Sequence, residues 1–471
     1  MSSLNTNRFP TFSAFNDYFF SCFDDPTVFD CQDFNLLKVV QEAVKLEYDF
    51  KSHIHRSVPS IALYHIIKGK VFSELKRKKV RLQQKLIQSE NKPFLFLDLG
   101  RTQIDSVGNI TSTYFHNILP LFCRELHTYG QLGNSNSELG FDFEASDIFE
   151  IEALLPVSKS DWVLRRALFQ TFKNIKKYTR FQSFDLFAIQ SGFSKFWQNY
   201  RAWNFLITLI NPQKCVFICH YHNEALLLAL KRNNVESIEL QHGLIASENI
   251  FYVYPEKVSS VVKRALFADQ ILVYGEFWRK RLLQGVEYAD EQIHIIGDYL
   301  FRAEAKDDSV AQIVAERIER GQKVILCTTQ TSLHSYFLEY IPWLAKDLLS
   351  RGNPAFIFIK PHPAEPEGLY ADLEQWPNVA VVQGNLDTWL QKADIHISIF
   401  SATLFEATRY GVPNFSLEAE ARQDYVDSVV ASGVSKLLRK GQNPLDLLEP
   451  TQTDSLAAEL FSEFSPEVLL G

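Results

Sequence analysis

The sequence predicts an α/β protein with two Rossmann-like, doubly wound domains that face a cleft, preceded by a helical extension. The chain has 471 residues, whereas a typical domain has ~100–200. From residue 93 onward, short apolar runs alternate with helix-like stretches of ~10–15 residues, which is typical of parallel sheets with helices on both faces. This alternation pauses near residues 255–268 and then restarts, which indicates two domains of this kind.

Four segments follow from this pattern. We expect an aromatic leader with a basic helix over 1–92, a first Rossmann-like domain over 93–255, a second over 256–440, and a helical tail over 441–471. The predicted strands are short and apolar: 94–97, 215–219, 237–240, 270–274, 294–296, 323–327, 355–359, 379–382 and 395–399. A stretch rich in glycine, asparagine and serine over 129–137 predicts a loop.

Composition excludes several classes of protein. Hydrophobic residues make up 46% and charged residues 22%, which is close to the globular average, and the net charge of −8 argues against a protein that coats nucleic acid. No uncharged apolar run approaches the ~18–20 residues that span a bilayer, and the first residues do not resemble a secretory signal. Six cysteines are too few for a disulfide scaffold, so we expect a cytoplasmic protein with reduced thiols.

One segment of the extension is strongly basic. Between Lys68 and Lys85 lie eight basic residues and one acid, Glu74, interleaved with apolar residues such as Phe72 and Leu75. This pattern predicts a basic amphipathic helix. Such a helix has either an ordinary solvated face or a contact with an anionic membrane surface or a polyanionic partner.

The most informative strand end carries a lysine and a histidine. The apolar run 357–359 leads into Lys360, Pro361, His362 and Pro363, and the two prolines stiffen the loop. A fixed cation and an imidazole suit a phosphate or diphosphate leaving group, through charge-assisted hydrogen bonds or proton donation. The alternative is a loop histidine without a role.

A second strand end leads into a helix start. After the predicted strand 395–399 come Ser401 and Thr403, whose hydroxyls could bind an anion or simply cap the helix. Glu406 lies about one turn further on, where its carboxylate could accept hydrogen bonds from a ribose diol. Its alternative is an ordinary acid that is favoured by the helix dipole.

A third strand end, in the first predicted domain, supplies His242 and Gly243. Gly243 permits a tight turn or the close approach of a ligand to the backbone. His242 could bind a ligand in the cleft or help to activate one, and the alternative is a structural histidine.

The sequence gives little reason to expect a metal or a resident cofactor. Cys215 and Cys219 lack the spacing of the usual zinc pairs and, with Phe217, point to one face of a strand. Neither a Gly-rich dinucleotide fingerprint nor a P-loop occurs, and no paired acidic motif follows a strand.

Three motifs together resemble a known family. KPHP at 360–363, QHG at 241–243, and S-x-T-x-x-E-A followed by G-V-P over 401–413 look like bacterial capsule and lipopolysaccharide glycosyltransferases of the GT-B fold. Kdo- and sialic-acid-transferring enzymes and CDP-glycerol glycerophosphotransferases are the most similar in style. The resemblance covers roughly residues 93–430. It implies that His362, Ser401 and Thr403 contact the nucleotide phosphate.

One position departs from the pattern of a subgroup. Many retaining GT-B enzymes carry two glutamates with seven residues between them around this helix; the second position matches Glu406, but the first is Ser398.

The resemblance implies a function. We expect a metal-independent glycosyltransferase that uses a nucleotide sugar, CMP-Kdo or another CMP-sugar, to extend a capsule or lipopolysaccharide O-antigen at the inner face of the membrane. His362 and His242 would be catalytic, and the donor-binding residues would be Lys360, Ser401, Thr403, Glu406 and Gly243. The donor would lie mainly on the second domain, and a glycan or lipid-linked glycan acceptor mainly on the first. The alternatives are a UDP-sugar transferase, a CDP-polyol phosphotransferase, a sugar-nucleotide 2-epimerase and a catalytically silent GT-B binding subunit.

Overall fold

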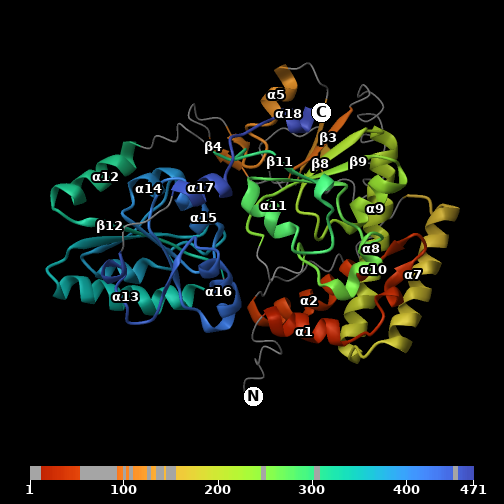
Figure 1. Cartoon of the computed structure of the whole chain (residues 1–471), viewed down its shortest axis with the longest axis horizontal. Helices are drawn as coiled ribbons and strands as arrows, with labels where there is room; N and C mark the ends of the chain where they lie inside the picture. Colours follow the sequence, from red (N-terminus) through yellow and green to blue (C-terminus); the bar gives the residue numbers. More distant parts are fainter. Residues whose placement is uncertain are drawn as a thin grey trace, which may run out of the picture.

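Figure 1 shows the computed structural model of the chain, in which two α/β domains lie side by side. The structure describes residues 12–53, 93–98, 102–104, 110–124, 129–133, 143–144, 155–245, 251–301, 308–331, 333–448 and 454–470. The basic helix predicted over Lys68–Lys85 lies outside these residues.

The first domain is built on a seven-stranded sheet in the order β11-β10-β9-β8-β3-β6-β7, and all of its strand pairs are parallel. Its strands are β3 (Phe94–Leu97), β6 (Tyr129–Gly133), β7 (Phe143–Glu144), β8 (Lys214–Ile218), β9 (Glu236–Leu240), β10 (Gln270–Val273) and β11 (Ile293–Ile295). The loop predicted over 129–137 is therefore wrong in its first half, because β6 pairs with the buried strand β3 despite its two glycines.

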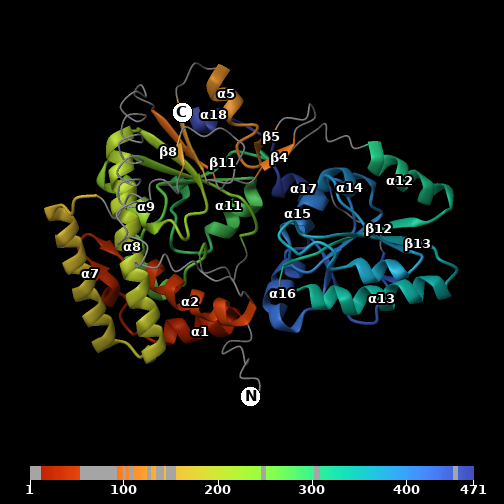
Figure 2. The same cartoon turned by 180° about the vertical axis from the view of Figure 1, so that it is seen from behind.

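The helices of the first domain cover this sheet (Figure 2). They are α1 (Phe12–Ser21), α2 (Leu37–His53), α5 (Leu119–Arg124), α7 (Lys159–Tyr178), α8 (Ser183–Ile210), α9 (Glu224–Arg232), α10 (Ser259–Val262) and α11 (Glu276–Leu282). The first segment of the chain is part of this domain, because Phe19 and Phe29 share a core with Leu95 and Cys215 of the sheet.

The second domain is built on a six-stranded parallel sheet in the order β14-β13-β12-β15-β16-β17. Its strands are β12 (Lys323–Thr328), β13 (Ala355–Lys360), β14 (Val379–Val381), β15 (Ile395–Ser398), β16 (Asn414–Leu417) and β17 (Lys436–Leu438). Its helices are α12 (Asp308–Glu319), α13 (His334–Ser350), α14 (Leu386–Lys392), α15 (Ala402–Thr408) and α16 (Gln423–Ala431). The doubly wound α/β architecture that the sequence predicted is confirmed.

The change from one sheet to the other comes later than the sequence predicted. We placed the start of the second domain at residue 256, but β10 and β11 pair in the first sheet. The pause near 255–268 corresponds instead to the short helices η3 (Glu256–Val258) and α10, which connect two strands of one sheet. The strands change sheet only between Ile295 and Lys323.

The end of the chain returns to the first domain. Helix α17 (Asp454–Leu460) contacts both α11 and α15, and α18 (Glu467–Leu470) follows it. The backbone N–H of Ser462 donates to the Tyr274 carbonyl at 2.8 Å, and that of Ser465 donates to the Ile296 carbonyl at 2.8 Å. Gly297 has a φ of +84°, and a Cβ there would meet the Glu463 carbonyl oxygen at 2.0 Å, so this crossing requires a glycine.

Candidate functional site

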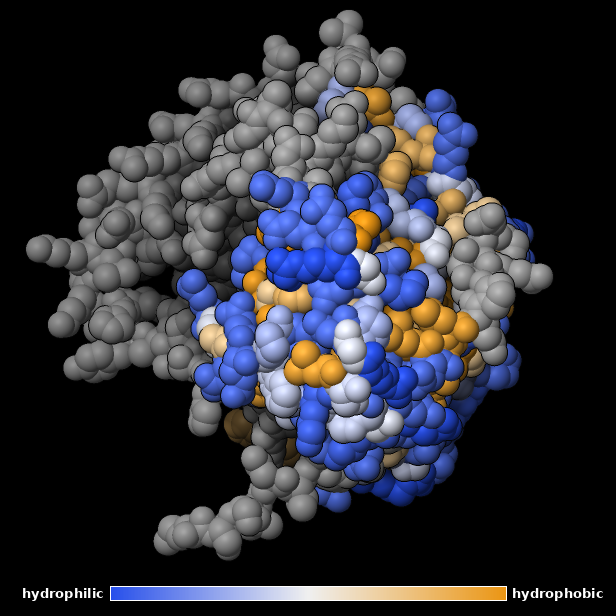
Figure 3. All heavy atoms as spheres, turned by 90° about the vertical axis from the view of Figure 1, so that its left-hand side faces the viewer, coloured by the Kyte–Doolittle hydropathy of each residue, from blue (hydrophilic) through white to orange (hydrophobic). Residues whose placement is uncertain are grey.

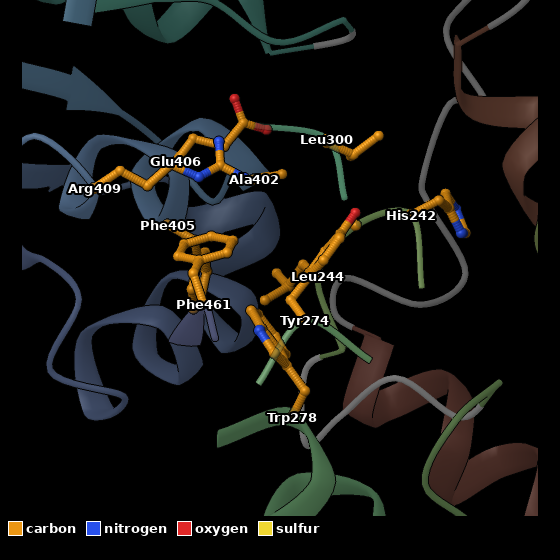
Figure 4. Close-up of a pocket in the computed structure, with 11 residues that line it drawn as sticks. His242, Leu244, Tyr274, Trp278, Leu300, Ala402, Phe405, Glu406, Arg409 and Phe461 are labelled. Carbon is orange, nitrogen blue, oxygen red and sulfur yellow. The ribbon is translucent and has the colours of Figure 1, made fainter. Parts of the chain in front are cut away.

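A pocket lies between the two domains, beside the carboxyl ends of β9 and β10 (Figure 4). The first domain contributes residues that follow its strands and one residue of α11. Helix α15 and the residue after it form the opposite wall, and the C-terminal segment contributes Phe461. In that order the residues are His242, Gly243, Leu244, Tyr274, Trp278 and Leu300, then Ala402, Phe405, Glu406 and Arg409, then Phe461. The pocket therefore brings together His242, Gly243 and Glu406, three site residues that the sequence predicted.

The loop that carries His242 is held by a buried amide. The Gln241 side chain is 1% exposed; its Oε1 accepts a hydrogen bond from the Tyr274 backbone N–H at 3.0 Å, and its Nε2 donates to the Gly243 carbonyl at 2.9 Å. The Tyr299 hydroxyl donates to the Gln241 carbonyl at 2.7 Å. Both ends of the amide are thus used, and the loop is fixed to the end of β10.

Gly243 borders open space. A Cβ at this position would meet nothing within 4 Å, and its backbone does not have a positive φ. Neither open space nor backbone geometry therefore requires a glycine here, and the close approach of a ligand to the backbone stays a prediction. His242 lies on the opposite side of the pocket from Glu406 (Figure 4), and its Nε2 is 3.2 Å from the Tyr221 hydroxyl.

Glu406 on α15 and Arg409, the residue that follows this helix, lie at the second-domain wall of the pocket (Figure 4). Burial raises the pKa of Glu406 to about 7, although the Arg409 charge acts against this rise. Arg409 is paired with Asp298 of the first domain: Nε lies 2.5 Å from Oδ2, and Nη2 donates to Oδ1 at 2.7 Å. The cation beside Glu406 is thus shared with a carboxylate that joins the two domains.

The loop after β13 has a defined hydrogen-bond network. The His362 backbone N–H donates to the Thr329 hydroxyl and to the Glu365 carboxylate, both at 3.0 Å. The Tyr370 hydroxyl donates to the same carboxylate at 2.9 Å. His362 Nδ1 accepts a hydrogen bond from the Ala364 backbone N–H at 3.1 Å, so the neutral ring carries its proton on Nε2.

Lys360, the last residue of β13, is only partly exposed. Burial lowers the pKa of its ammonium group. An anion beside Lys360 would reverse this effect, because an opposite charge favours the charged form.

The helix start after β15 connects to a buried polar chain. Ser401 caps α15 by accepting a hydrogen bond from the Thr403 backbone N–H at 3.3 Å. The Thr403 hydroxyl lies 2.8 Å from the Thr328 hydroxyl, which lies 2.8 Å from Nε2 of the fully buried His396. His396 Nδ1 lies 2.7 Å from Asn414 Oδ1.

The direction of these hydrogen bonds follows from the charge on His396. Burial lowers the pKa of His396 to about 4, so its ring is neutral at pH 7. Its Nδ1–H donates to Asn414 Oδ1, because the Asn414 Nδ2 donates to the Leu404 carbonyl at 2.8 Å. Nε2 therefore accepts from Thr328, and Thr328 accepts from Thr403. The Thr403 hydroxyl proton points into the protein, which leaves Ser401 as the hydroxyl of the pair with a proton for a ligand.

Two adjacent threonines join the KPHP loop to the helix start. Thr328 is the last residue of β12 and Thr329 follows it; β12 lies between β13 and β15 in the sheet, and both threonines are buried. Thr329 contacts the loop of His362, and Thr328 contacts Thr403. Ser398 also belongs here, since its hydroxyl donates to the Thr328 carbonyl at 2.8 Å. The structure thus places Lys360, His362, Ser401 and Thr403 at neighbouring strand ends, outside the lining of the pocket.

Sequence reasoning missed these threonines and a polar cluster in the first domain. His220, at the end of β8, is fully buried with Glu239 of β9: Nδ1 lies 2.5 Å from Glu239 Oε2, and Nε2 lies 2.6 Å from the Phe251 carbonyl. Both ring nitrogens face acceptors, so His220 and Glu239 share a proton. The Tyr252 hydroxyl donates to the other Glu239 oxygen at 2.8 Å.

Next to this cluster, His222 contacts the N-terminal segment. Its backbone N–H donates to Glu42 Oε1 at 2.7 Å, and its Nδ1 lies 3.1 Å from Oε2. His222 and Cys219 have positive φ angles of 68° and 70°, which non-glycine residues adopt at an energetic cost. The only signal in the sequence was the pair of histidines after a strand, because Glu42 lies 180 residues away.

Among the described residues, no group of three or more His, Cys, Asp and Glu side chains is arranged to hold a metal ion. Among the helices of the described ranges, none combines the length and the hydropathy that crossing a membrane needs.

Comparison with known proteins defines the fold. No family model and no curated protein matches the chain. A Listeria monocytogenes structure assigned as a UDP-N-acetylglucosamine 2-epimerase matches with a TM-score of 0.50 at 13% identity, over 81% of this chain and 95% of that one. Two further matches are weaker: UDP-GlcNAc 2-epimerase from Neisseria meningitidis bound to UDP-GlcNAc (TM-score 0.46, 13% identity, 80% and 98% covered) and the glycosyltransferase SnogD from Streptomyces nogalater (0.46, 15%, 81% and 98%).

The class of protein follows from the fold alone. Two parallel α/β sheets with a pocket between them, together with the similarity to the Listeria structure, show that the chain has the GT-B fold with two Rossmann-like domains. The fold that the resemblance implied is confirmed.

Proposed function

We propose that the chain is a glycosyltransferase that moves a sugar from a nucleotide donor to a glycan acceptor during the assembly of bacterial surface polysaccharide. The second domain would hold the donor and the first domain the acceptor. The bond between the anomeric carbon and the nucleotide phosphate breaks, a bond to an acceptor hydroxyl forms, and that hydroxyl loses its proton.

One observation carries this proposal. Lys360, the Nε2–H of His362 and the Ser401 hydroxyl are hydrogen-bond donors at the ends of β13 and β15, on the two sides of the Thr328–Thr329 pair. Such a set suits the charge that develops on a leaving phosphate, without requiring a metal. Thr403 supports the site through Thr328 and contributes its backbone N–H to the Ser401 cap.

The pocket between the domains would position the reacting groups. Glu406 lies on the donor side, where its carboxylate would accept hydrogen bonds from sugar or ribose hydroxyls. His242 and Gly243 lie on the acceptor side, where His242 would bind the donor or help to activate the acceptor. Closure of the two domains on both ligands would bring them together and exclude water.

We favour a cytidine donor, CMP-Kdo or another CMP-sugar, because the combined motifs resemble those of CMP-sugar enzymes. Thermal unfolding with CMP, CDP, UDP and GDP tests this choice, since a ligand that binds the native state raises the melting temperature. The largest shift is expected with CMP. A clearly larger shift with UDP or GDP would overturn the cytidine assignment and favour a UDP-sugar transferase or another nucleotide class.

The acceptor would be a glycan or lipid-linked glycan at the cytoplasmic face of the membrane, with no role for nucleic acid. Transfer of labelled sugar from the identified donor to a short soluble glycan tests the transferase activity. A chain that binds nucleotide but transfers sugar to no acceptor would be a silent binding subunit. Release of a polyol phosphate from a CDP-polyol would indicate a phosphotransferase.

A sugar-nucleotide 2-epimerase is the second candidate, because the Listeria structure with the same fold is assigned as one. The two activities differ in one requirement: an epimerase needs no acceptor. Incubation with UDP-GlcNAc alone, followed by NMR of the sugar, would show a new C2 epimer if the chain is an epimerase. The transferase proposal expects the sugar to stay unchanged.

A further inference from the structure

The outward face of α7 carries exposed aromatic and basic side chains together. The exposed positions Lys159, Trp162, Arg166, Phe169, Lys173 and Lys177 follow one another at intervals of three or four residues. Because an α-helix has 3.6 residues per turn, they form one stripe. We call these six residues the α7 stripe. The opposite side of the helix, with Leu164, Leu168 and Ile175, is buried in the core of the first domain.

The aromatic rings of the stripe are unusually open to solvent. Trp162 is 56% exposed and Phe169 is 59% exposed. Among the described residues, four of the five exposed large aromatic side chains lie on α7 and α8, the others there being Tyr178 and Phe187. Lys173 lies over the Phe169 ring at 4.6 Å, and Arg165 lies over the Trp162 ring at 5.2 Å, yet both aromatic residues stay more than half exposed.

The charged residues of α7 are almost all basic. Helix α7 contains six basic residues and one acid, Asp161. Asp161 is buried and is used in the capping box with Ser158, so it does not offset the charge of the outward face. Within the described part of the chain, no ion pair involves Arg166, Lys173 or Lys177. A chain with a net charge of −8 thus concentrates positive charge on this helix.

The position of α7 leaves the site accessible. Figure 1 and Figure 2 both place α7 at the edge of the first domain that is farthest from the second domain. The far end of the molecule is different: Figure 3 shows a mainly hydrophilic surface on the second domain with separate hydrophobic patches. A flat partner on the α7 stripe would therefore not obstruct the pocket between the domains.

We propose that the α7 stripe docks onto an anionic lipid surface. Trp and Phe rings suit the interface between headgroups and acyl chains, while lysine and arginine are attracted to anionic headgroups. The matching charge favours this occupant over a second copy of this acidic chain. The docking does not depend on transferase or epimerase activity, and the α7 stripe shares no residue with the basic segment Lys68–Lys85.

Vesicle binding tests the charged part of the stripe. The full chain is incubated with phosphatidylcholine vesicles with or without phosphatidylglycerol, and the variant carries Arg166→Gln, Lys173→Gln and Lys177→Gln. We expect roughly 100-fold weaker binding of the variant to the anionic vesicles, since each basic residue near the surface contributes about 1 kcal/mol. The matched control removes the same charge from exposed positions of the second domain, by Lys346→Gln, Lys392→Gln and Arg439→Gln, and is expected to bind like the wild type.

Quenching by lipids with brominated acyl chains tests the aromatic part. Part of the tryptophan fluorescence should be quenched in the wild type, and that part should disappear in Trp162→Phe. Equal binding by the wild type and the charge variant, equal binding to neutral and anionic vesicles, or no vesicle binding at all would overturn the proposal. A change of oligomeric state in the charge variant without lipid would also overturn it, because the stripe would then be a contact between protein chains.

Discussion

The strand ends of the two domains use polar residues in different ways. In the second domain, Lys360, His362 and Ser401 keep donor groups at the molecular surface while Thr328 and Thr329 fix them from behind. In the first domain, His220 and Glu239 are both fully buried, and their hydrogen-bonding atoms are used by each other, Tyr252 and Phe251. The polar groups of the second domain therefore suit a ligand, whereas this pair in the first domain holds the protein together.

This difference assigns a limited chemical role to the first domain. His242 is the histidine that this domain places at the pocket, and the loop that carries it is fixed by Gln241 and Tyr299. The His220–Glu239 pair does not line the pocket, and the Tyr221 hydroxyl, next to His220 in the chain, contacts the His242 ring. In the proposed transferase, the acceptor would meet a wall with one imidazole, while the charged groups that suit a phosphate lie on the other domain.

The largest expected effect tests the structural role of the first-domain cluster. Glu239→Leu should lower the free energy of unfolding by about 3–5 kcal/mol, because it leaves His220 without the partner that shares its buried proton. Urea unfolding followed by circular dichroism measures this change. Glu316→Leu on the exposed face of α12 is the matched control and should change stability little. A loss below about 1 kcal/mol for Glu239→Leu would mean that the cluster does not stabilise the domain.

The second prediction tests the functional role of the second domain. His362→Ala should lower turnover by at least ~10²-fold, as the loss of a proton donor or of leaving-group stabilisation does. Melting temperature should stay close to that of the wild type, because His362→Ala removes the Ala364 hydrogen bond to the ring, whereas the bonds of the His362 backbone to Thr329 and Glu365 remain. His294→Ala, on the edge strand β11, serves as the control. Turnover near the wild-type rate in folded His362→Ala would remove this residue from the mechanism.

A smaller effect is expected at Thr328, which connects the buried His396 with Thr403 at the candidate ligand site. Thr328→Val keeps the shape of the side chain but removes the hydroxyl between His396 and Thr403, and should destabilise the protein by about 1–3 kcal/mol. It should also weaken nucleotide binding, because Thr403 and the start of α15 lose their support. Nucleotide affinity and urea unfolding should therefore both change. Unaltered affinity in a destabilised variant would show that the polar chain acts on stability alone.

The sequence predicted the second-domain groups because they are local. Lys360 and His362 directly follow one apolar run and Ser401 directly follows another, and the parallel order of the strands brings these strand ends together. Thr328 and Thr329 were missed because nothing in their own segment marks them; their roles appear only when β12 lies between β13 and β15. The His222–Glu42 contact was missed for the same reason, since it depends on how α2 packs.

The predicted domain boundary at residue 256 was wrong for a related reason. The periodicity of short apolar runs identifies parallel strands, but it contains no information about which sheet a strand joins. Strands β10 and β11 look like the strands that follow them, and only their pairing with β9 assigns them to the first domain. Strand β6 was taken for a loop because its glycines conceal a segment that pairs with β3.

The smallest expected effect concerns Glu406, which differs both from the exposed donor groups of the second domain and from the fully buried pair of the first domain. Glu406 faces the pocket like a ligand-binding residue, yet its charge is opposed by burial like that of an internal group. Its pKa of about 7 in the folded protein exceeds the ordinary value near 4.5, so folding favours the protonated form. This contribution to stability is fully present below pH 4.5 and is lost as the pH rises through 7.

Glu406→Gln should therefore stabilise the protein at pH 8 by about 1–2 kcal/mol relative to the wild type, and should have little effect at pH 4.5. Melting temperatures of both proteins between pH 4.5 and pH 8 measure the difference, with Glu316→Gln as the exposed control. The same difference at both pH values would show that Glu406 titrates normally, so that the Arg409 guanidinium compensates its charge even though it is already paired with Asp298. In that case Glu406 would be ionised at pH 7, and both of its carboxylate oxygens could only accept hydrogen bonds from donor hydroxyls.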